Sequence, residues 1–213
     1  MTNDGNNDLS MLVLQEKHLI GRGNGRICFR HPINHKLCLK LPLNERGERE
    51  SVRESVYLDR ASKRYGDSVY KHVARLYEPV VTDRGKAWAA ERVLDELTDR
   101  PSPLLRDVLT EASFEQDAQA WNAAFEEFMD WTAKSAIVFR DWSSTNVCVK
   151  KMADGRNRFI IIDGFAPKEI LLRWFPNRTY GRHRNNHFAK RANVESISAL
   201  IELCARERSD IQS

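Results

Sequence analysis

Two kinds of hydrophobic pattern divide this chain, and their order constrains the fold more than any other feature. Short apolar runs between glycine- and proline-containing turns predict strands over residues 11–43 and 72–95, with one helix between them. The longest apolar stripe of helical spacing follows, and it predicts a helix over residues 113–135. This order predicts an α+β protein with two unlike lobes, divided near residue 95.

The composition is that of a soluble globular protein, with 41% hydrophobic and 30% charged residues among 213. No apolar run reaches the length of a membrane-spanning helix. None of the four cysteines lies in a CxxC pair or at zinc-site spacing, so we expect reduced thiols and a cytoplasmic location. We expect a disordered leader over residues 1–14, a β-rich lobe with one helix over 15–94 and a short helical lobe over 95–213.

Three glycines, Gly21, Gly23 and Gly25, mark the first turn between strands. Glycine allows backbone N–H groups to approach phosphate oxygens closely. A dinucleotide-binding loop would be followed by a helix, whereas RICFRH follows here and predicts a strand; the sequence also lacks the GK[ST] ending of a P-loop. Two interpretations remain open, a lid over nucleotide phosphates and a flexible hairpin.

Lys40 lies between two leucines in the predicted strand KLCLKL, where a charged residue is unexpected. The next helix contains Glu54, with Glu50 one turn earlier on the same side. A strand lysine can bind nucleotide phosphates while a helix glutamate holds the ammonium group in place. Glu54 is the candidate partner of Lys40, Glu50 is the rival, and a solvated surface position is the alternative for each.

The stretch FRDWSSTN places Asp141 and Asn146 on either side of a polar loop. An aspartate there can accept the proton of an attacking hydroxyl, and an asparagine five residues later can reach a metal ion. Asp163 ends the apolar strand of FIIIDGF and supplies a second candidate metal ligand. The alternative for the loop is a plain surface turn.

Taken in this order, these stretches resemble the protein-kinase-like superfamily and, more closely, the bacterial YrbL family of the PhoP regulatory network. The resemblance spans residues 15 to about 205 and rests on the stretches IGRGNGRICFRHP, LCLKL, VRESVYL, SSTNVCV and IIIDG. It implies a bilobal protein-kinase-like fold with a truncated, mostly helical C-terminal lobe.

The sequence departs from the protein-kinase pattern at several positions. Arg26 stands where the third glycine would fall, Phe139 replaces the histidine of H-R-D, and Ser143 replaces the lysine of the catalytic loop. The metal motif reads D-G-F, and too few residues follow Asp163 to form the helices that bind a peptide substrate. These departures from the pattern count against phosphorylation of a protein substrate, and the resemblance leaves the acceptor unidentified.

The resemblance implies a small atypical kinase that transfers the γ-phosphate of ATP to a hydroxyl acceptor. The alternative is a pseudokinase-type regulatory module that binds nucleotide without phosphotransfer. In either case it implies Mg²⁺ at Asn146 and Asp163, and in the enzyme Asp141 is the catalytic base. The residues expected to contact the nucleotide are Gly21, Gly23, Gly25, Lys40, Glu54, Glu91 and Val93.

The segment 173–191 interleaves aromatic and basic residues. It is interpreted either as a docking surface for an anionic substrate or as a solvated basic segment whose aromatic rings pack on the lobe. A nucleic-acid partner is the least favoured interpretation, because the net charge is only +4. His183 and His187 are one helical turn apart but lack a third ligand nearby, so we expect no metal site there.

Overall fold

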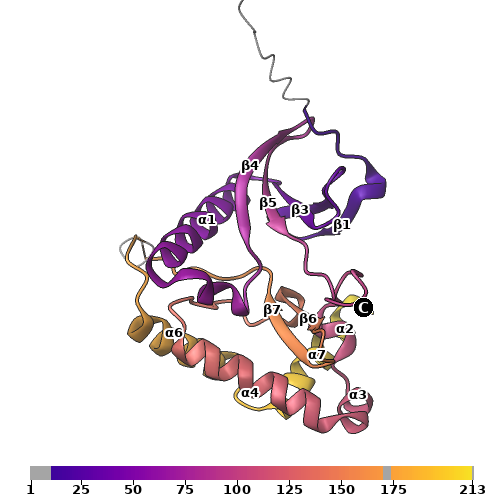
Figure 1. Ribbon diagram of the computed structural model, residues 1–213, viewed down its shortest axis with the longest axis vertical. Helices are drawn as coiled ribbons and strands as arrows, with labels where there is room; N and C mark the ends of the chain where they lie inside the picture. Colours follow the sequence, from indigo (N-terminus) through magenta and orange to yellow (C-terminus); the bar gives the residue numbers. More distant parts are fainter. Residues whose placement is uncertain (1–10, 170–173, 213) are drawn as a thin grey trace, which may run out of the picture. The chain divides into compact units, whose positions relative to one another are not determined.

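The computed structural model describes residues 11–169 and 174–212 (Figure 1). It is a mixed α+β protein, as the sequence predicted. The chain forms two compact units, one of residues 1–51 and 76–91, the other of 52–75 and 92–213. The later boundary falls close to the predicted one.

Residues 52–75, however, belong to the second unit, whereas the sequence assigned them to the first lobe. They contain most of helix α1 (Glu45–Tyr65) and the 3-10 helix η2 (Gly66–Lys71). Packing explains the difference, because Tyr57 is 1% exposed and its hydroxyl donates to the Ala136 carbonyl oxygen. The apolar face of α1 gave no sign of which partner would bury it.

The first unit is built on a five-stranded antiparallel sheet. Its strands are β1 (Leu19–Arg22), β2 (Arg26–Arg30), β3 (Leu37–Pro42), β4 (Leu76–Thr82) and β5 (Gly85–Glu91), in the spatial order β1-β2-β3-β5-β4. Alternate residues of β2, β3 and β5 point to one face, because side chains alternate along a strand. That face forms a core of Leu14, Ile27, Phe29, Leu39, Leu41, Ala87 and Ala89.

The leader predicted over residues 1–14 extends too far, because residues 12 and 14 make hydrogen bonds with Asp83. Leu14 N–H donates to Oδ1 of Asp83 at 2.8 Å, and Asp83 N–H donates to the Leu12 carbonyl oxygen at 2.9 Å. Leu14 is 1% exposed, because its side chain completes the core of the sheet. Residues 1–10 of the predicted leader lie outside the described residues.

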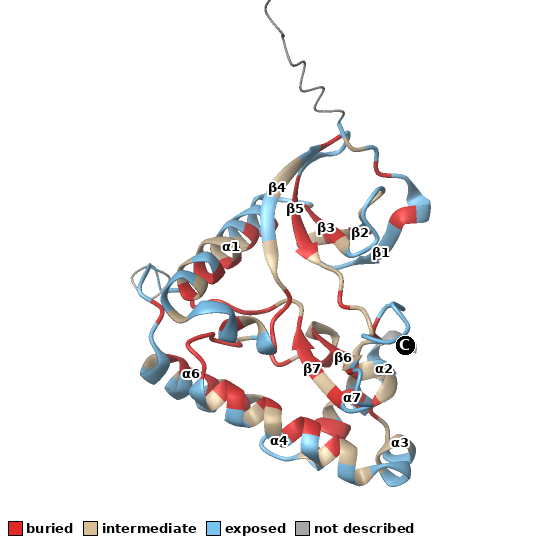
Figure 2. Ribbon diagram, viewed as in Figure 1, coloured by how far each residue is buried: buried red, intermediate tan, exposed pale blue. Residues whose placement is uncertain are grey.

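The second unit packs helices around a two-stranded antiparallel hairpin of β6 (Val147–Lys151) and β7 (Asn157–Ile161). Helix α4 (Ala118–Lys134) buries one face against this hairpin, and Figure 2 shows that face as a row of buried positions. Phe128 lies at the centre of its aromatic core, with ring centroids 5.8 Å from those of Phe159 and Trp142. The other helices of the second unit are α2 (Leu105–Val108), α3 (Glu111–Gln116), η3 (Ser144–Asn146), α6 (Arg178–Ala192) and α7 (Ile197–Gln212). The first unit also contains the 3-10 helix η1 (Glu16–His18).

The helix predicted over residues 113–135 is two helices, α3 and α4, separated at Asp117. Asp117 leaves the helical region of backbone space, and its carboxylate accepts a hydrogen bond from Ala120 N–H at 3.0 Å. An aspartate in this position starts a new helix, since its side chain satisfies a backbone donor that has no partner within the helix. None of the helices in the described ranges has the length and apolar character needed to span a bilayer.

Candidate functional site

Two segments that are distant in the sequence pair directly in the second unit and form the centre of the candidate site. The backbone N–H groups of Arg140 and Asp141 both donate to the Gly164 carbonyl oxygen, at 2.9 and 3.0 Å. Phe139 and Phe165 form an isolated antiparallel bridge beside these bonds. The loop after Phe139 is therefore held through its backbone against the turn that follows β7.

Gly164 allows the two segments to approach this closely. Its φ of +77° lies in the left-handed region, and a Cβ atom added to it would lie 2.8 Å from Cβ of Asp141 and 2.9 Å from Nδ2 of Asn146. The Gly164 N–H donates to Oδ1 of Asp163 at 2.7 Å. The structure therefore brings Asp141, Asn146 and Asp163 together around one glycine.

Local hydrogen bonds orient Asn146. Its side-chain Nδ2 donates to the Asp141 backbone carbonyl oxygen at 3.2 Å, and the backbone carbonyl oxygen of Asn146 accepts from Ile162 N–H at 2.8 Å. Because the amide nitrogen is directed at Asp141, Oδ1 is the atom of this side chain that can bind a cation. Asp141 is exposed, and Asn146 and Asp163 are partly exposed, so a ligand can reach all three side chains.

The donors in this cluster suit a magnesium ion. Mg²⁺ prefers oxygen ligands and binds proteins through one or two carboxylates, completing its shell with water and substrate phosphates. Asp163 and the amide oxygen of Asn146 supply a partial set of this kind. Within residues 11–169 and 174–212, no three His, Cys, Asp or Glu side chains form a group that could hold a metal ion. Asp163 and Asn146 would leave the rest of the coordination shell to water and phosphate oxygens, so this pair of donors fits a cation that is shared with a phosphate-bearing ligand.

Helix α7 anchors the loop between Asp141 and Asn146. The backbone N–H of Ser144 donates to Oε2 of Glu207 at 2.9 Å, and the Ser144 hydroxyl contacts the same oxygen. Ser144 is 1% exposed, so this carboxylate satisfies a donor that water cannot reach. Sequence reasoning missed Glu207, because 63 residues separate it from its partner.

Helix α6 holds the segment that leads into the loop. Asn185 is 1% exposed, and its Oδ1 accepts from Phe139 N–H at 2.8 Å. Its Nδ2 donates to the carbonyl oxygens of Thr132 and Ile137, each at 2.8 Å. This buried amide uses both donor hydrogens and its acceptor, so it fixes the path of the chain before Asp141. Sequence reasoning missed Asn185 as well.

Two of the departures from the kinase pattern have local roles in the structure. Phe139 is fully buried and packs on Trp142, with ring centroids 4.8 Å apart. The Ser143 hydroxyl accepts a hydrogen bond from Thr145 N–H at 3.3 Å, and its oxygen lies 2.6 Å from that of Thr145. Phe139 seats the loop on the aromatic core, and Ser143 stabilises the turn within it.

Lys40 lies on the face of the sheet opposite the apolar core of the first unit. In the sheet, the backbone of Lys40 lies opposite Cys28 of β2 and Trp88 of β5. Its neighbours Leu39 and Leu41 point into the core. Lys40 is 8% exposed, which excludes a solvated surface position. A buried ammonium group is costly unless other groups solvate it, and Lys40 is among the residues that interact with other groups of the chain.

Of the two glutamates weighed for the helix, Glu54 is the buried one, with 1% of its surface exposed. The side chain of Glu50 is 22% exposed, and its Oε1 accepts from Arg46 Nε at 3.4 Å, one helical turn away. The surface alternative is therefore wrong for Glu54. Lys40 belongs to the first unit and Glu54 to the second, and their pairing stays a prediction.

The glycine-rich turn packs against the start of α1 within the first unit. The Gly25 carbonyl oxygen accepts from Leu43 N–H at 2.9 Å, and Nδ2 of Asn44 donates to the Asn24 carbonyl oxygen at 3.3 Å. A Cβ atom added to Gly47 would lie 1.9 Å from the Gly25 oxygen. The turn is therefore tied to the helix at its tip, and Gly47, which sequence reasoning missed, permits the contact.

The last two residues expected to contact the nucleotide, Glu91 and Val93, belong to different units. Glu91 ends β5 opposite Leu37, and its carbonyl oxygen lies 3.9 Å from Sγ of Cys38 in the first unit. Val93, in the second unit, is 6% exposed and packs with Ala74, Cys148 and Ile160. Its carbonyl oxygen accepts from Ser102 N–H at 3.0 Å, so this acceptor is already engaged within the chain.

A sequence model of the family described as "PhoP regulatory network protein YrbL" matches residues 12–192. The chain belongs to this YrbL family. It is similar to the "Uncharacterized protein YrbL" of Escherichia coli (strain K12) and to that of Shigella flexneri. Each is 20% identical over 163 residues, which cover 76% of this chain and 76% of the relative.

The match to the YrbL family includes every residue that the sequence predicted for the site. It ends at residue 192, the last residue of α6, so α7 with Glu207 lies beyond it. The family description names a regulatory network and no chemical activity.

Arginines contact two aromatic rings of the basic segment in this YrbL-family chain. The guanidinium of Arg184 lies 4.5 Å from the ring centroid of Phe188, and that of Arg60 in α1 lies 4.1 Å from the ring of Trp174. Trp174 and Phe175 are nevertheless 47% and 64% exposed, so packing on the unit does not bury these rings, and the docking role stays a prediction. Arg173 lies outside the described residues.

Proposed function

We propose that this YrbL-family chain is a small atypical phosphotransferase of the protein-kinase-like superfamily, which transfers the γ-phosphate of ATP to a hydroxyl acceptor. The observation that carries the proposal is the convergence of Asp141, Asn146 and Asp163 on Gly164. Side chains with these chemical roles must meet in one place for phosphoryl transfer.

In the proposed reaction, Asp163 and Oδ1 of Asn146 bind Mg²⁺, which offsets the negative charge of the ATP phosphates. Asp141 accepts the proton of the acceptor hydroxyl. The hydroxyl oxygen forms a bond to the γ-phosphorus, the bond from this phosphorus to the β,γ-bridging oxygen breaks, and ADP leaves. Little covalent chemistry falls to the protein, so the anchoring of the Asp141 loop by α6 and α7 is central to the mechanism.

The first unit supports the same proposal. A glycine-rich turn between β1 and β2, a buried lysine on β3 and a helix directly after β3 follow the order of a kinase-like N-terminal lobe. We assign Lys40 to the α- and β-phosphates and Glu54 to the orientation of Lys40.

The acceptor is proposed to be a small hydroxyl-bearing molecule, reached through or near the basic segment. After Asp163 the chain adds two long helices, α6 and α7, and both pack within the second unit. Asn185 of α6 and Glu207 of α7 are used to hold the Asp141 loop. Helices engaged in this way are poor candidates for a peptide-binding platform.

A second candidate function is a nucleotide-binding regulatory module without phosphotransfer. The replacement of two catalytic-loop residues favours it, because Phe139 is fully buried and Ser143 is bonded to Thr145. Neither residue can supply the cation or imidazole that protein kinases place there. The presence of Asp141 beside Asn146 and Asp163 favours the enzyme.

Thermal unfolding with and without Mg²⁺-ATP tests the proposal. We expect Mg²⁺-ATP to raise the melting temperature of the wild type, and Asp163→Ala to abolish the rise. Asp59→Ala, an exposed carboxylate paired with Lys63, is the matched control and should keep the rise. A rise of equal size in Asp163→Ala would contradict the proposed metal site.

Turnover distinguishes the two candidate functions. In the enzyme without its acceptor, water takes the place of the acceptor hydroxyl, so wild type with Mg²⁺ slowly converts ATP to ADP and inorganic phosphate, and Asp141→Ala stops this release while the thermal shift persists. In the binding module, both proteins show the thermal shift and neither releases ADP.

A further inference from the structure

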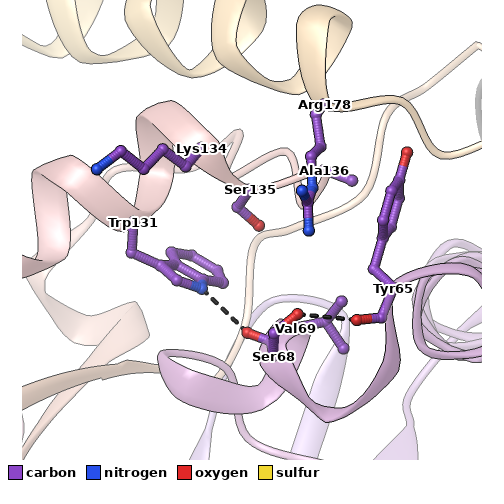
Figure 3. Close-up of a pocket in the computed structure, with 8 residues that line it drawn as sticks. All are labelled: Tyr65, Ser68, Val69, Trp131, Lys134, Ser135, Ala136 and Arg178. Carbon is purple, nitrogen blue, oxygen red and sulfur yellow. Dashed lines mark hydrogen bonds between the residues drawn. The ribbon is translucent and has the colours of Figure 1, made fainter.

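A pocket of about 170 Å³ lies in the second unit. It is formed where the end of α1, the helix η2, the end of α4 and the start of α6 meet (Figure 3). None of the residues proposed to bind nucleotide or metal lines it. Its chemistry is therefore independent of the proposed function.

The volume sets the size of the ligand. An apolar cavity of about 150 Å³ holds one benzene molecule, whereas pockets for drug-sized ligands begin at about 300 Å³. The observed pocket therefore accommodates a single six-membered ring with a small substituent. A nucleotide or a disaccharide is too large for it.

The walls of the pocket are aromatic and held in place. Figure 3 shows the rings of Tyr65 and Trp131 on opposite sides of the space, with Val69 at its base. The Tyr65 hydroxyl donates to the Pro176 carbonyl oxygen at 3.1 Å, and Nε1 of Trp131 donates to the Ser68 carbonyl oxygen at 3.3 Å. Because both rings are fixed before a ligand arrives, little conformational entropy is lost on binding.

One end of the pocket is polar and positively charged. The guanidinium of Arg178 lies 4.7 Å from the Tyr65 ring centroid, and Lys134 stands at the rim, where it pairs with Asp130. Ser135 is 8% exposed, and its hydroxyl accepts from Ile137 N–H at 3.0 Å, so its own hydrogen can be donated to a ligand. The lining residues include two cations and no acid.

We propose that this pocket binds a small aromatic carboxylate. The ring packs against Trp131 and Val69, and the carboxylate accepts hydrogen bonds from the hydroxyl of Ser135 and from the guanidinium of Arg178, which lies over the ring of Tyr65. Arginine is suited to this role because its planar fork matches the two oxygens of a carboxylate. The aromatic walls select the ring, and the cations select the negative charge.

Titration of the full chain with benzoate, and with benzylamine as a cation of similar size, tests the proposal. We expect benzoate to bind with a dissociation constant on the order of 1 mM, as suits a ligand of this size, and benzylamine to bind at least tenfold more weakly. In NMR spectra the indole N–H signal of Trp131 should shift with benzoate. That of Trp121, which donates to Ser113, is an internal control and should not move.

Two exposed residues of α6 provide matched variants that keep the fold. Arg178→Gln should weaken benzoate binding at least fivefold, whereas Lys190→Gln, which removes one charge three turns along the same helix, should change it less than twofold. Equal affinity for benzoate and benzylamine, or unchanged affinity in Arg178→Gln, would overturn the proposal. So would the absence of saturable benzoate binding at about 20 mM. None of these outcomes bears on ATP or Mg²⁺ binding.

Discussion

Glu207, on the last helix, accepts a hydrogen bond from the buried backbone N–H of Ser144 at 2.9 Å. Ser144 lies midway between Asp141 and Asn146, so the carboxylate fixes the centre of the loop that carries both. The match to the YrbL family ends before α7, and this contact is therefore supplied by a part of the chain beyond the matched region.

Glu207→Ala should destabilise the protein by about 1–3 kcal/mol, because it leaves the Ser144 N–H buried without an acceptor. Urea unfolding measures this change. Glu202→Ala, on an exposed position of the same helix, is the control and should change stability by less than about 0.5 kcal/mol. Equal stability of the two variants would show that the loop does not depend on Glu207.

Gly164→Ala should disrupt the site more than backbone strain alone explains. An alanine there adopts a strained positive φ and also meets Asp141 and Asn146 at under 3.0 Å. Gly155→Ala is a matched control, because Gly155 has a φ of +83° but open space around its Cβ position. We expect a loss of about 1 kcal/mol for Gly155→Ala and at least twice that for Gly164→Ala.

The variants Gly164→Ala and Gly155→Ala also distinguish the effect of backbone strain on ligand binding from the effect of steric overlap. Only Gly164→Ala should lose the thermal stabilisation by Mg²⁺-ATP. Equal losses of stability in the two alanine variants would mean that the side chains of Asp141 and Asn146 can move aside.

Gly47→Ala should destabilise the first unit, although alanine is the better helix former by about 1 kcal/mol. The added methyl group would overlap the Gly25 carbonyl oxygen, so the glycine-rich turn must move away from α1. Gly21→Ala, with no atom within 4 Å of its Cβ position, is the control. A net loss of about 2 kcal/mol in urea unfolding is expected for Gly47→Ala, and a gain in stability would contradict the contact.

His72 makes stability depend on pH. Burial lowers the pKa of His72 to about 4, and the smaller effects of the Phe159 carbonyl oxygen, 2.7 Å from Nδ1, and of Glu127 oppose this shift. As the pH falls, the imidazole of His72 is therefore protonated in the unfolded chain near pH 6.5, before it is protonated in the folded protein. The stabilisation is complete above pH 6.5 and is lost as the pH falls toward 4, by about 3 kcal/mol in total.

Urea unfolding at several pH values measures how steeply the free energy of unfolding changes with pH. His72→Asn keeps a donor for the Phe159 oxygen but does not titrate, so it should flatten the slope between pH 6.5 and 4. His183→Asn, at an exposed position, should leave the slope as in the wild type. If the pH dependence of stability persists in His72→Asn, it arises from groups other than His72.

The strands were accessible from sequence because alternation and turn residues are local patterns. The meeting of Asp141, Asn146 and Asp163 was expected from the resemblance to the kinase motifs, since no local pattern connects residues 141 and 163. The break at Asp117 could also have been found, since an aspartate three residues before Ala120 is a typical helix start.

Helix α6 was missed for a physical reason. Its buried residues are Gly181, Asn185 and Ala189, spaced at one helical turn, and none is a large apolar residue. A Cβ atom on Gly181 would lie 2.5 Å from the Ser135 carbonyl oxygen, so the helix approaches its neighbour backbone to backbone. A search for apolar periodicity does not detect a helix that packs through small and amide side chains.

The order in which the chain is synthesised gives the anchors of the loop a further consequence. Asp141, Asn146 and Asp163 all emerge from the ribosome before Asn185 and Glu207 do. A nascent chain therefore carries all three side chains while the groups that position them are still missing. The cation binding that we propose should therefore appear late in translation, only after α7 has been made.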